Sequence, residues 1–188
     1  SRGLGDVYKR QIQGFSFIML FTYISASPFI IQKIYGMSAL QFSIMFAAIG
    51  ITLIISSQLV GVLVDRIERR QLLKIVTYIQ VLGVVIVAIT LLNHLSFWIL
   101  VIGFIILVAP VTAVASLGFS IAMDESTRGR GSASSLLGLV QFLLGGLMSS
   151  LVNVMGEHNV IPYVVIISMT AVIMIILQTI YTRLQRRS

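Results

Sequence analysis

The sequence predicts an all-α integral membrane protein with six transmembrane helices. Hydrophobic residues make up 57% of the 188 residues and charged residues only 10%, whereas soluble domains are about a quarter charged. The mean hydropathy is +1.03. A helix needs about 20 mostly apolar residues to cross a bilayer. Six runs without Lys, Arg, Asp, Glu or His meet this need, at residues 12–31, 42–64, 75–92, 97–123, 132–155 and 161–181.

The basic residues follow an alternating pattern along these runs. Twelve of the 13 Lys and Arg residues lie before the first run or after the second, fourth and sixth, and only Lys33 lies in an alternate connection. Cytoplasmic loops of membrane proteins carry such an excess. We therefore expect a multi-pass protein of the inner (plasma) membrane with both termini in the cytoplasm. The net charge of +7 follows from this topology and indicates no nucleic-acid partner, because the basic residues form no single face.

The first two runs carry polar side chains within the expected bilayer. Run 12–31 holds Ser16, Thr22, Tyr23, Ser25 and Ser27 before Pro28, and run 42–64 holds Thr52, Ser56, Ser57 and Gln58. Intramembrane polar groups usually face the bundle interior or a wet cavity. These two runs are therefore expected to turn their polar faces inward. An interhelical hydrogen bond is the alternative explanation for each side chain.

The third and fourth runs show two irregularities. Run 75–92 also holds polar residues, Thr77, Tyr78 and Gln80, so polarity alone does not separate cavity-lining from peripheral helices. Run 97–123 is the longest and contains Pro110 in its interior. Proline removes a backbone donor and clashes with the preceding turn. We therefore predict a kink at Pro110, with a neighbouring group bonded to the freed carbonyl.

The last two runs have the length and apolar composition of membrane spans, and each contains residues that bear on packing or helix start. Run 132–155 has small residues four apart, such as Gly145 and Ser149, a spacing that lets membrane helices approach closely. It also holds Gln141 in an otherwise apolar stretch. Run 161–181 begins with Pro162, which the first turn of a helix tolerates. Residues 182–188 form a short cytoplasmic tail.

Residues 1–11 differ from the rest of the chain. They are polar, begin without Met and resemble a translated adapter sequence, so we interpret them as a non-native tail. The chain is then expected to be the downstream part of a longer protein. Nine basic residues against Lys33 still set the orientation once this tail is excluded.

Motifs for catalysis, metals and cofactors are absent from the sequence. There is no Cys, no phosphate-binding loop and no zinc-protease motif. Ser132 follows Gly131, as a serine nucleophile of an intramembrane protease could, but no run holds a histidine to act as base. We therefore predict no enzyme, no cofactor and no metal.

The connection after the second run holds a compact motif made of Gly61, Asp65, Arg66, Arg69 and Arg70. Gly61 permits close helix packing, Asp65 suits the positive N-terminus of a neighbouring helix, and the arginines hold the loop in the cytoplasm. The motif resembles the major facilitator signature G-x-x-x-D-[RK]-x-G-[RK]-[RK], with Glu68 in place of the second glycine. The resemblance implies a gating motif. A plain basic loop would explain the arginines but not Gly61 and Asp65 at this spacing.

Two further stretches resemble a narrower family. Residues 23–32, 35–38 and 41–42 are similar to the seventh helix and following loop of the Bcr/CflA drug-resistance transporters, and residues 131–145 are similar to their eleventh helix. These are twelve-span drug:proton antiporters of the major facilitator superfamily. The resemblance runs from about residue 15 to the C-terminus. It implies the C-terminal six-helix half of that fold, with a missing N-terminal half as its partner.

The resemblance also implies a substrate site between the two halves. Runs one, two, four and five would line the cavity, while three and six would be peripheral. The candidates for substrate contact are Tyr23, Ser27, Gln58 and Gln141, and an interhelical hydrogen bond explains each about equally well. Proton coupling usually needs an intramembrane acid. No run contains one, so the coupling carboxylate is expected in the missing half.

The predicted function is export of small amphiphilic drugs in exchange for protons, that is, multidrug efflux and antibiotic resistance. Two alternatives stay open. One is a major facilitator transporter of a nutrient or metabolite. The other is a complete six-span protein, such as a scaffold or channel subunit. Sequence upstream of residue 11 separates them, because six more apolar runs would reject the second and an acid in the first would favour proton-coupled export.

Overall fold

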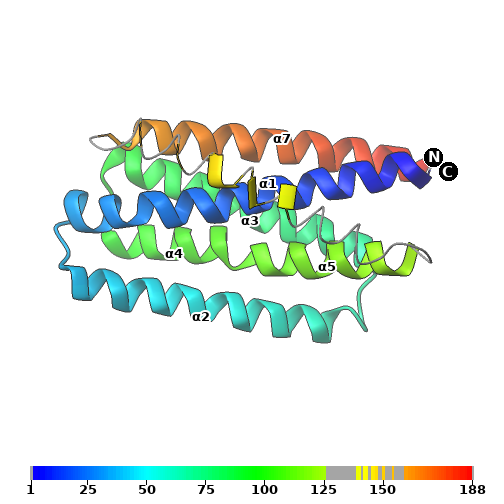
Figure 1. The fold of residues 1–188 in the computed structure, drawn as a ribbon, viewed down its shortest axis with the longest axis horizontal. Helices are drawn as coiled ribbons and strands as arrows, with labels where there is room; N and C mark the ends of the chain where they lie inside the picture. Colours follow the sequence, from blue (N-terminus) through cyan, green and yellow to red (C-terminus); the bar gives the residue numbers. More distant parts are fainter. Residues whose placement is uncertain are drawn as a thin grey trace.

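The computed structural model describes residues 2–125, 139–140, 142–143, 145–147, 150, 154 and 159–187. All the regular elements in these ranges are helical, and they lie side by side along one direction (Figure 1). They are α1 (Arg2–Phe29), the π-helical η1 (Ile30–Ile34), α2 (Ala39–Leu63), α3 (Arg69–Asn93), α4 (Phe97–Val108), α5 (Pro110–Glu125) and α7 (Ile161–Arg186). In the described part, five helical segments are long and apolar enough to cross a membrane, with α4 and the start of α5 counted together.

The helices extend beyond several of the predicted runs. Helix α1 begins at Arg2 and passes without interruption through residue 11, so the predicted tail is helical, and α7 continues past 181 to Arg186. Helix α3 begins at Arg69 rather than 75. The reason is physical, because hydropathy identifies only the part of a helix that lies in the bilayer, whereas helical hydrogen bonding continues into polar residues. That the tail is non-native stays a prediction.

The start of α2 is fixed by a capping box. The Ser38 hydroxyl accepts a hydrogen bond from the Gln41 backbone N–H at 3.1 Å, and the Gln41 side chain accepts from the Ser38 N–H at 2.9 Å. This arrangement satisfies two donors that a helix start otherwise leaves without partners. It explains why α2 begins three residues before the apolar run predicted at 42.

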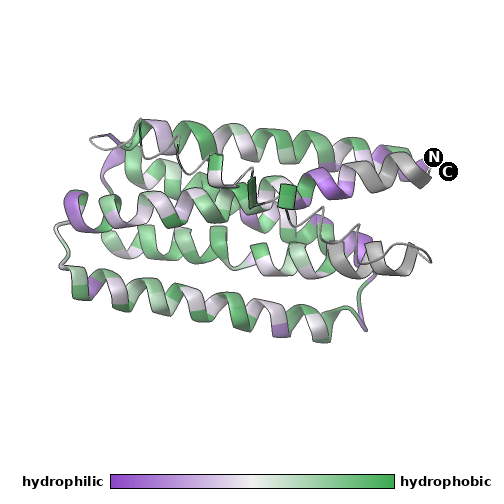
Figure 2. Cartoon of the chain, in the orientation of Figure 1, coloured by the Kyte–Doolittle hydropathy of each residue, from purple (hydrophilic) through white to green (hydrophobic). Residues whose placement is uncertain are grey.

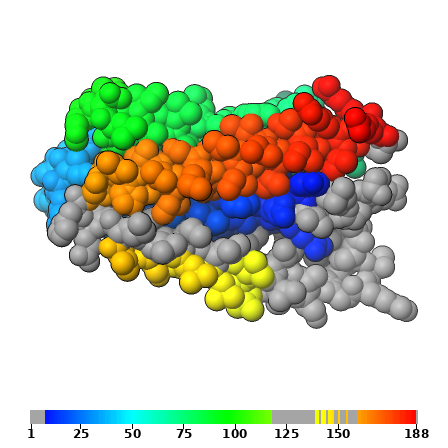
Figure 3. All heavy atoms as spheres, turned by 90° about the horizontal axis from the view of Figure 1, so that it is seen from above, coloured from blue at the N-terminus to red at the C-terminus, as the bar shows by residue number. Residues whose placement is uncertain are grey.

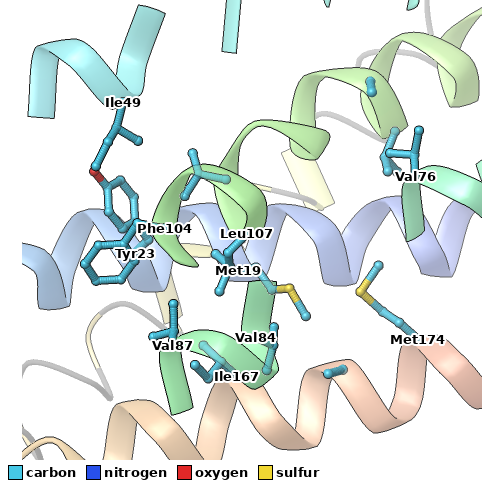
Figure 4. Packing of buried hydrophobic residues seen from close by; sticks show 14 of the residues in the cluster. Met19, Tyr23, Ile49, Val76, Val84, Val87, Phe104, Leu107, Ile167 and Met174 are labelled. Carbon is cyan, nitrogen blue, oxygen red and sulfur yellow. The ribbon is translucent and has the colours of Figure 1, made fainter. Parts of the chain in front are cut away.

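Helix packing centres on α1 and α3. Helix α1 packs against α7, α5 and α4, while α3 packs against α4, α7 and α5. Helix α7 runs the length of the face seen in Figure 3. Helix α2 packs mainly against α5 and α4, and only 11% of its most apolar segment is buried, against 39% to 56% in the other spans. The buried apolar side chains from α1, α2, α3, α4 and α7 meet in one core (Figure 4).

The two ends of the bundle differ in charge. Both chain termini and the α2–α3 connection lie at the same end (Figure 1). That end therefore gathers the basic residues of 66–74 and 183–187, while Lys33 lies towards the other end. Apolar residues dominate the length between the ends (Figure 2). The alternation of charge along the sequence thus becomes a charge difference between two ends of the structure.

Candidate functional site

Tyr23 stands at an aromatic junction of three helices. Its ring, on α1, stacks in parallel on Phe46 of α2 at 5.8 Å between centroids and meets the edge of Phe104 of α4 at 5.0 Å. The residue is only 2% exposed, and its hydroxyl has no hydrogen-bond partner among the described residues. The oxygen lies beside the apolar Ile49 (Figure 4). A polar group is thus held in a dry, aromatic environment.

Three further hydroxyls share this condition, and one of them, that of Tyr181, lies in the last turns of α7. Ser27 follows Tyr23 by one turn of α1 and is fully buried, and Tyr163 is buried near the start of α7. Neither hydroxyl has a partner in the described part of the structure. A buried polar group without a partner costs roughly 1–3 kcal/mol. The hydroxyls of Tyr23, Ser27 and Tyr163 are therefore places where water or a polar group of a ligand would be stabilised, and the same physical argument holds for Tyr181.

The chain changes from α-helical to π-helical shortly after Tyr23 and Ser27. Pro28 lies inside the helix, and the π-helical turn Ile30–Ile34 follows it. Short π-helical turns occur frequently at functional sites. Beyond the turn, the Tyr35 hydroxyl donates to the Leu95 carbonyl at 3.0 Å and fastens this end of α1 to the α3–α4 connection. Partial burial raises the pKa of Tyr35 above its usual value.

The other two predicted contact residues do not join Tyr23 and Ser27. Gln58 is exposed on α2 and lies nine residues beyond Ile49, about 14 Å along the helix axis. Gln141 lies outside the described residues. Around Gln58, α2 presents an exposed apolar surface made of Ile51, Ile54, Ile55, Leu59 and Val62. Of the predicted contact residues that the structure describes, Tyr23 and Ser27 are therefore buried in the interior, and Gln58 lies on the surface.

The described part of the predicted fifth span lies against α1. The Phe142 ring meets the edge of the Phe21 ring at 5.6 Å, and Gly145 lies so close to Phe21 that a Cβ there would overlap the ring. Gly145 was one of the small residues expected to allow close helix approach. Its neighbour Ser149 in that pattern lies outside the described residues.

The predicted gating motif lies at the basic end of the bundle. Gly61, Asp65, Arg66 and Arg70 are exposed, while Arg69 is partly buried. Glu68 takes the N-cap position of α3 without a side-chain capping bond. Within the described residues, the Asp65 carboxylate has no hydrogen bond or ion pair, and no atom would lie within 4 Å of a Cβ on Gly61. The start of the predicted fifth span, a candidate neighbour, lies outside the described part.

Pro110 separates two helices. Helix α4 ends at Val108 and α5 begins at Pro110, while Ala109 between them keeps α-helical dihedral angles and donates to the Ile105 carbonyl, so this helix break is a local interruption within one span. The Gln80 side chain of α3 donates to the Leu107 carbonyl in the last turn of α4 at 3.2 Å, where helix carbonyls lack intrahelical partners. The Thr112 hydroxyl of α5 contacts the Ala109 carbonyl at 3.3 Å and donates to the Leu53 carbonyl of α2 at 2.9 Å. The break is thus bonded from two neighbouring helices.

Sequence reasoning missed the roles of Gln80 and Tyr163. Gln80 was noticed only as a polar residue in a span expected to be peripheral, although it is fully buried and accepts from the Ser16 hydroxyl at 3.0 Å. The signal that could have identified it is its type, because it is the one amide side chain in run 75–92. Tyr163 carries no comparable signal, because tyrosines near span ends are common.

The sequence profile of the Major Facilitator Superfamily matches residues 11–150. The chain belongs to the Major Facilitator Superfamily. The all-α membrane fold class is thereby confirmed, and the chain is a member of a family of transport proteins that bind small molecules within a membrane. The resemblance of the motif at Gly61 to the superfamily signature agrees with this assignment.

Two curated relatives from this superfamily were compared. The chain is 33% identical over 153 residues to the uncharacterized MFS-type transporter YdgK of Bacillus subtilis (strain 168), covering 81% of the chain and 38% of the relative. It is 32% identical over 148 residues to a bicyclomycin resistance protein homolog of Haemophilus influenzae, covering 79% and 37% respectively. The chain therefore spans less than two fifths of the length of either relative.

Proposed function

We propose that this chain is the C-terminal six-helix half of a secondary active transporter. In this proposal the whole protein exports small amphiphilic drugs in exchange for protons, by alternating access. The similarity to the bicyclomycin resistance protein homolog, at 32% identity over 79% of the chain, carries the drug-export part. Membership of a transporter superfamily supports the transport part.

Two irregular helices support a mechanism of alternating access. Secondary transporters use broken or discontinuous helices near their substrate sites. Here α4 and α5 are separated at Ala109, and α1 passes into a π-helical turn after Pro28. A helix with such an interruption can change its angle there without breaking long runs of intrahelical hydrogen bonds. The two interruptions therefore suit a half that rocks between inward and outward states.

In the proposed site, the aromatic junction receives the drug. The rings of Tyr23, Phe46 and Phe104 supply apolar and stacking contacts, which suit amphiphilic ligands. The unpartnered hydroxyls of Tyr23 and Ser27 supply hydrogen bonds. Gln58 and Gln141 are proposed to act from other parts of the cavity. In the described spans, Asp and Glu occur only at the end of the bundle and not in the part that crosses the membrane. The proton-carrying carboxylate is therefore proposed to lie in the other half.

In the proposed topology, the basic end of the bundle faces the cytoplasm of a bacterium, across the plasma membrane. The gating motif of Gly61, Asp65, Arg66, Arg69 and Arg70 then lies at the cytoplasmic mouth. This orientation is supported by the common position of the termini and the α2–α3 connection (Figure 1) and by the preference of basic residues for the inside.

The test uses everted membrane vesicles that contain the full-length protein and a pH-sensitive dye. After respiration acidifies the lumen, adding bicyclomycin or another amphiphilic drug should release protons, and vesicles without the protein should show no release. Proton release with a sugar or an amino acid, but with no drug, would instead support antiport of a metabolite. A protein that inserts normally but responds to none of these solutes would contradict the proposal.

A further inference from the structure

Gln80 joins three helices in the middle of the bundle. Its side-chain oxygen accepts from the Ser16 hydroxyl of α1 at 3.0 Å, and its side-chain nitrogen donates to the Leu107 carbonyl of α4 at 3.2 Å. Both Ser16 and Gln80 are fully buried. A single amide therefore connects α1, through α3, to the last turn before the helix break at Ala109.

Close backbone packing places Gln80 at this position. Gly83 lies three residues further along α3, and a Cβ built there would lie only 2.6 Å from the Leu107 Cα. Residues three apart share a face of a helix. The face of α3 that carries Gln80 and Gly83 is therefore in direct contact with the backbone at the end of α4. A larger residue at 83 would hold the Gln80 amide away from the Leu107 carbonyl.

Helix α1 is also connected to the other side of the break. The Gln13 side chain donates to the Ala115 carbonyl of α5 at 3.4 Å. One turn along α1, Ser16 reaches α4 through Gln80. A change of angle at Ala109 cannot leave both connections unchanged, because they attach α1 to helices on opposite sides of the break.

We propose that Gln80 is a positioning residue of the transport cycle. In one state, its hydrogen bonds to Ser16 and Leu107 hold the end of α4 against α1. In the other state these two bonds are broken, and the angle between α4 and α5 is different. The inference rests on the proposed transport function. It assigns a conformational role to a helix that the family resemblance treats as peripheral.

The size of the effect follows from the two bonds. A hydrogen bond between membrane helices contributes about 0.6 kcal/mol on average, which shifts an equilibrium about three-fold. Removing both bonds of Gln80 should shift the balance between the two states about seven-fold. Ser16→Ala removes the bond to α1 and keeps the bond to Leu107, so it should shift the balance about three-fold.

The matched control is Thr77→Val. Thr77 is fully buried in α3, as Gln80 is, but its hydroxyl donates to the Leu73 carbonyl of its own helix at 2.8 Å. The substitution removes a buried polar group from the same helix without touching the break. A general loss of stability should therefore affect Thr77→Val and Gln80→Met alike, whereas a change of conformational balance should affect Gln80→Met only.

The experiment measures distances in the full-length protein by pulsed electron paramagnetic resonance. Spin labels are attached at Trp98→Cys on α4 and Val165→Cys on α7, both exposed positions. Residues 1–188 contain no cysteine, and any cysteine elsewhere in the full-length protein is first replaced by serine. Gln80→Met should redistribute the populations of short and long distances about seven-fold, and Thr77→Val should leave them unchanged. Ser16→Ala gives the smaller shift and serves as the test if Gln80→Met does not fold.

Drug transport by the same variants gives a second readout. The maximal rate should fall for Gln80→Met with little change in KM, because Gln80 does not touch the proposed drug site. Distance distributions of Gln80→Met and Ser16→Ala that match the wild type would overturn the inference. If the wild type transports no drug, the proposed function fails, while the distances still decide whether Gln80 controls the break.

Discussion

Gly83→Ala tests the close packing between α3 and α4. A Cβ at position 83 would lie 2.6 Å from the Leu107 Cα and 2.7 Å from the Ile106 carbonyl carbon, and both are backbone atoms that cannot rotate away. The Leu107 backbone nitrogen would lie closer still, so restoring an ordinary contact of 3.4 Å requires the two helices to separate by about 1 Å. The same movement would stretch the 3.2 Å bond from Gln80 to Leu107 to about 4 Å, beyond hydrogen-bond range.

The expected cost combines three terms. Overpacking costs about 1–3 kcal/mol, and the lost interhelical hydrogen bond adds about 0.6 kcal/mol. The helix propensity of alanine over glycine returns about 1 kcal/mol. We therefore expect Gly83→Ala to lower the free energy of unfolding by roughly 1–3 kcal/mol.

Two other glycines make a graded series. At Gly103, a Cβ would meet the Ile86 and Val87 side chains at 2.9 Å, and side chains can yield more readily than backbone, so Gly103→Ala should cost less. At Gly50 nothing lies within 4 Å, so Gly50→Ala should be neutral or stabilising. The assay is thermal unfolding of the detergent-solubilised full-length protein, followed by size-exclusion chromatography of the surviving fraction. Equal midpoints for Gly83→Ala and Gly50→Ala would refute the reasoning.

Three further predictions concern transport. In the full-length protein, Asp65→Asn should impair drug export while membrane insertion stays normal, and Glu68→Gln is its control in the same loop; export at the wild-type rate would remove Asp65 from the gate. Tyr23→Phe should raise the KM for the drug a few-fold without loss of thermal stability, because the hydroxyl has no partner to lose among the described residues; an unchanged KM would leave it with a packing role. Residues 12–188 alone, in vesicles, should not take up drug, because half of the proposed cavity is missing, and gradient-driven uptake would contradict this.

Local features of the fold were predictable from the sequence. Bilayer thickness and hydropathy identify the apolar runs, and the chemistry of Pro110 places the break between α4 and α5. The side chain that bonds to the backbone beside the break was not predictable, because its identity depends on how α3 is rotated about its axis. That rotation places Gln80 and Gly83 against Leu107, and it is set by packing between residues far apart in the sequence.

The site was less predictable than the fold, for the same reason. Tyr23 and Gln58 both looked like cavity residues, since both are polar residues in apolar spans. Their difference in exposure arises from the position of α2 at the edge of the half, which no pattern within α2 reveals. Tyr163 joins Tyr23 and Ser27 as a buried unpartnered hydroxyl only after α7 has packed against α1.

The hydrogen bonds of α1 also have a consequence for synthesis. Ser16 finds its partner 64 residues later in the chain, and Gln13 finds its partner 102 residues later. At roughly ten residues per second, a ribosome makes these partners about six and ten seconds after it makes α1. Helix α1 therefore enters the bilayer before Gln13 and Ser16 have these partners. We expect it to stay near the insertion machinery until α3 and α5 emerge, whereas α2, whose exposed surface is mostly apolar, can enter the lipid earlier.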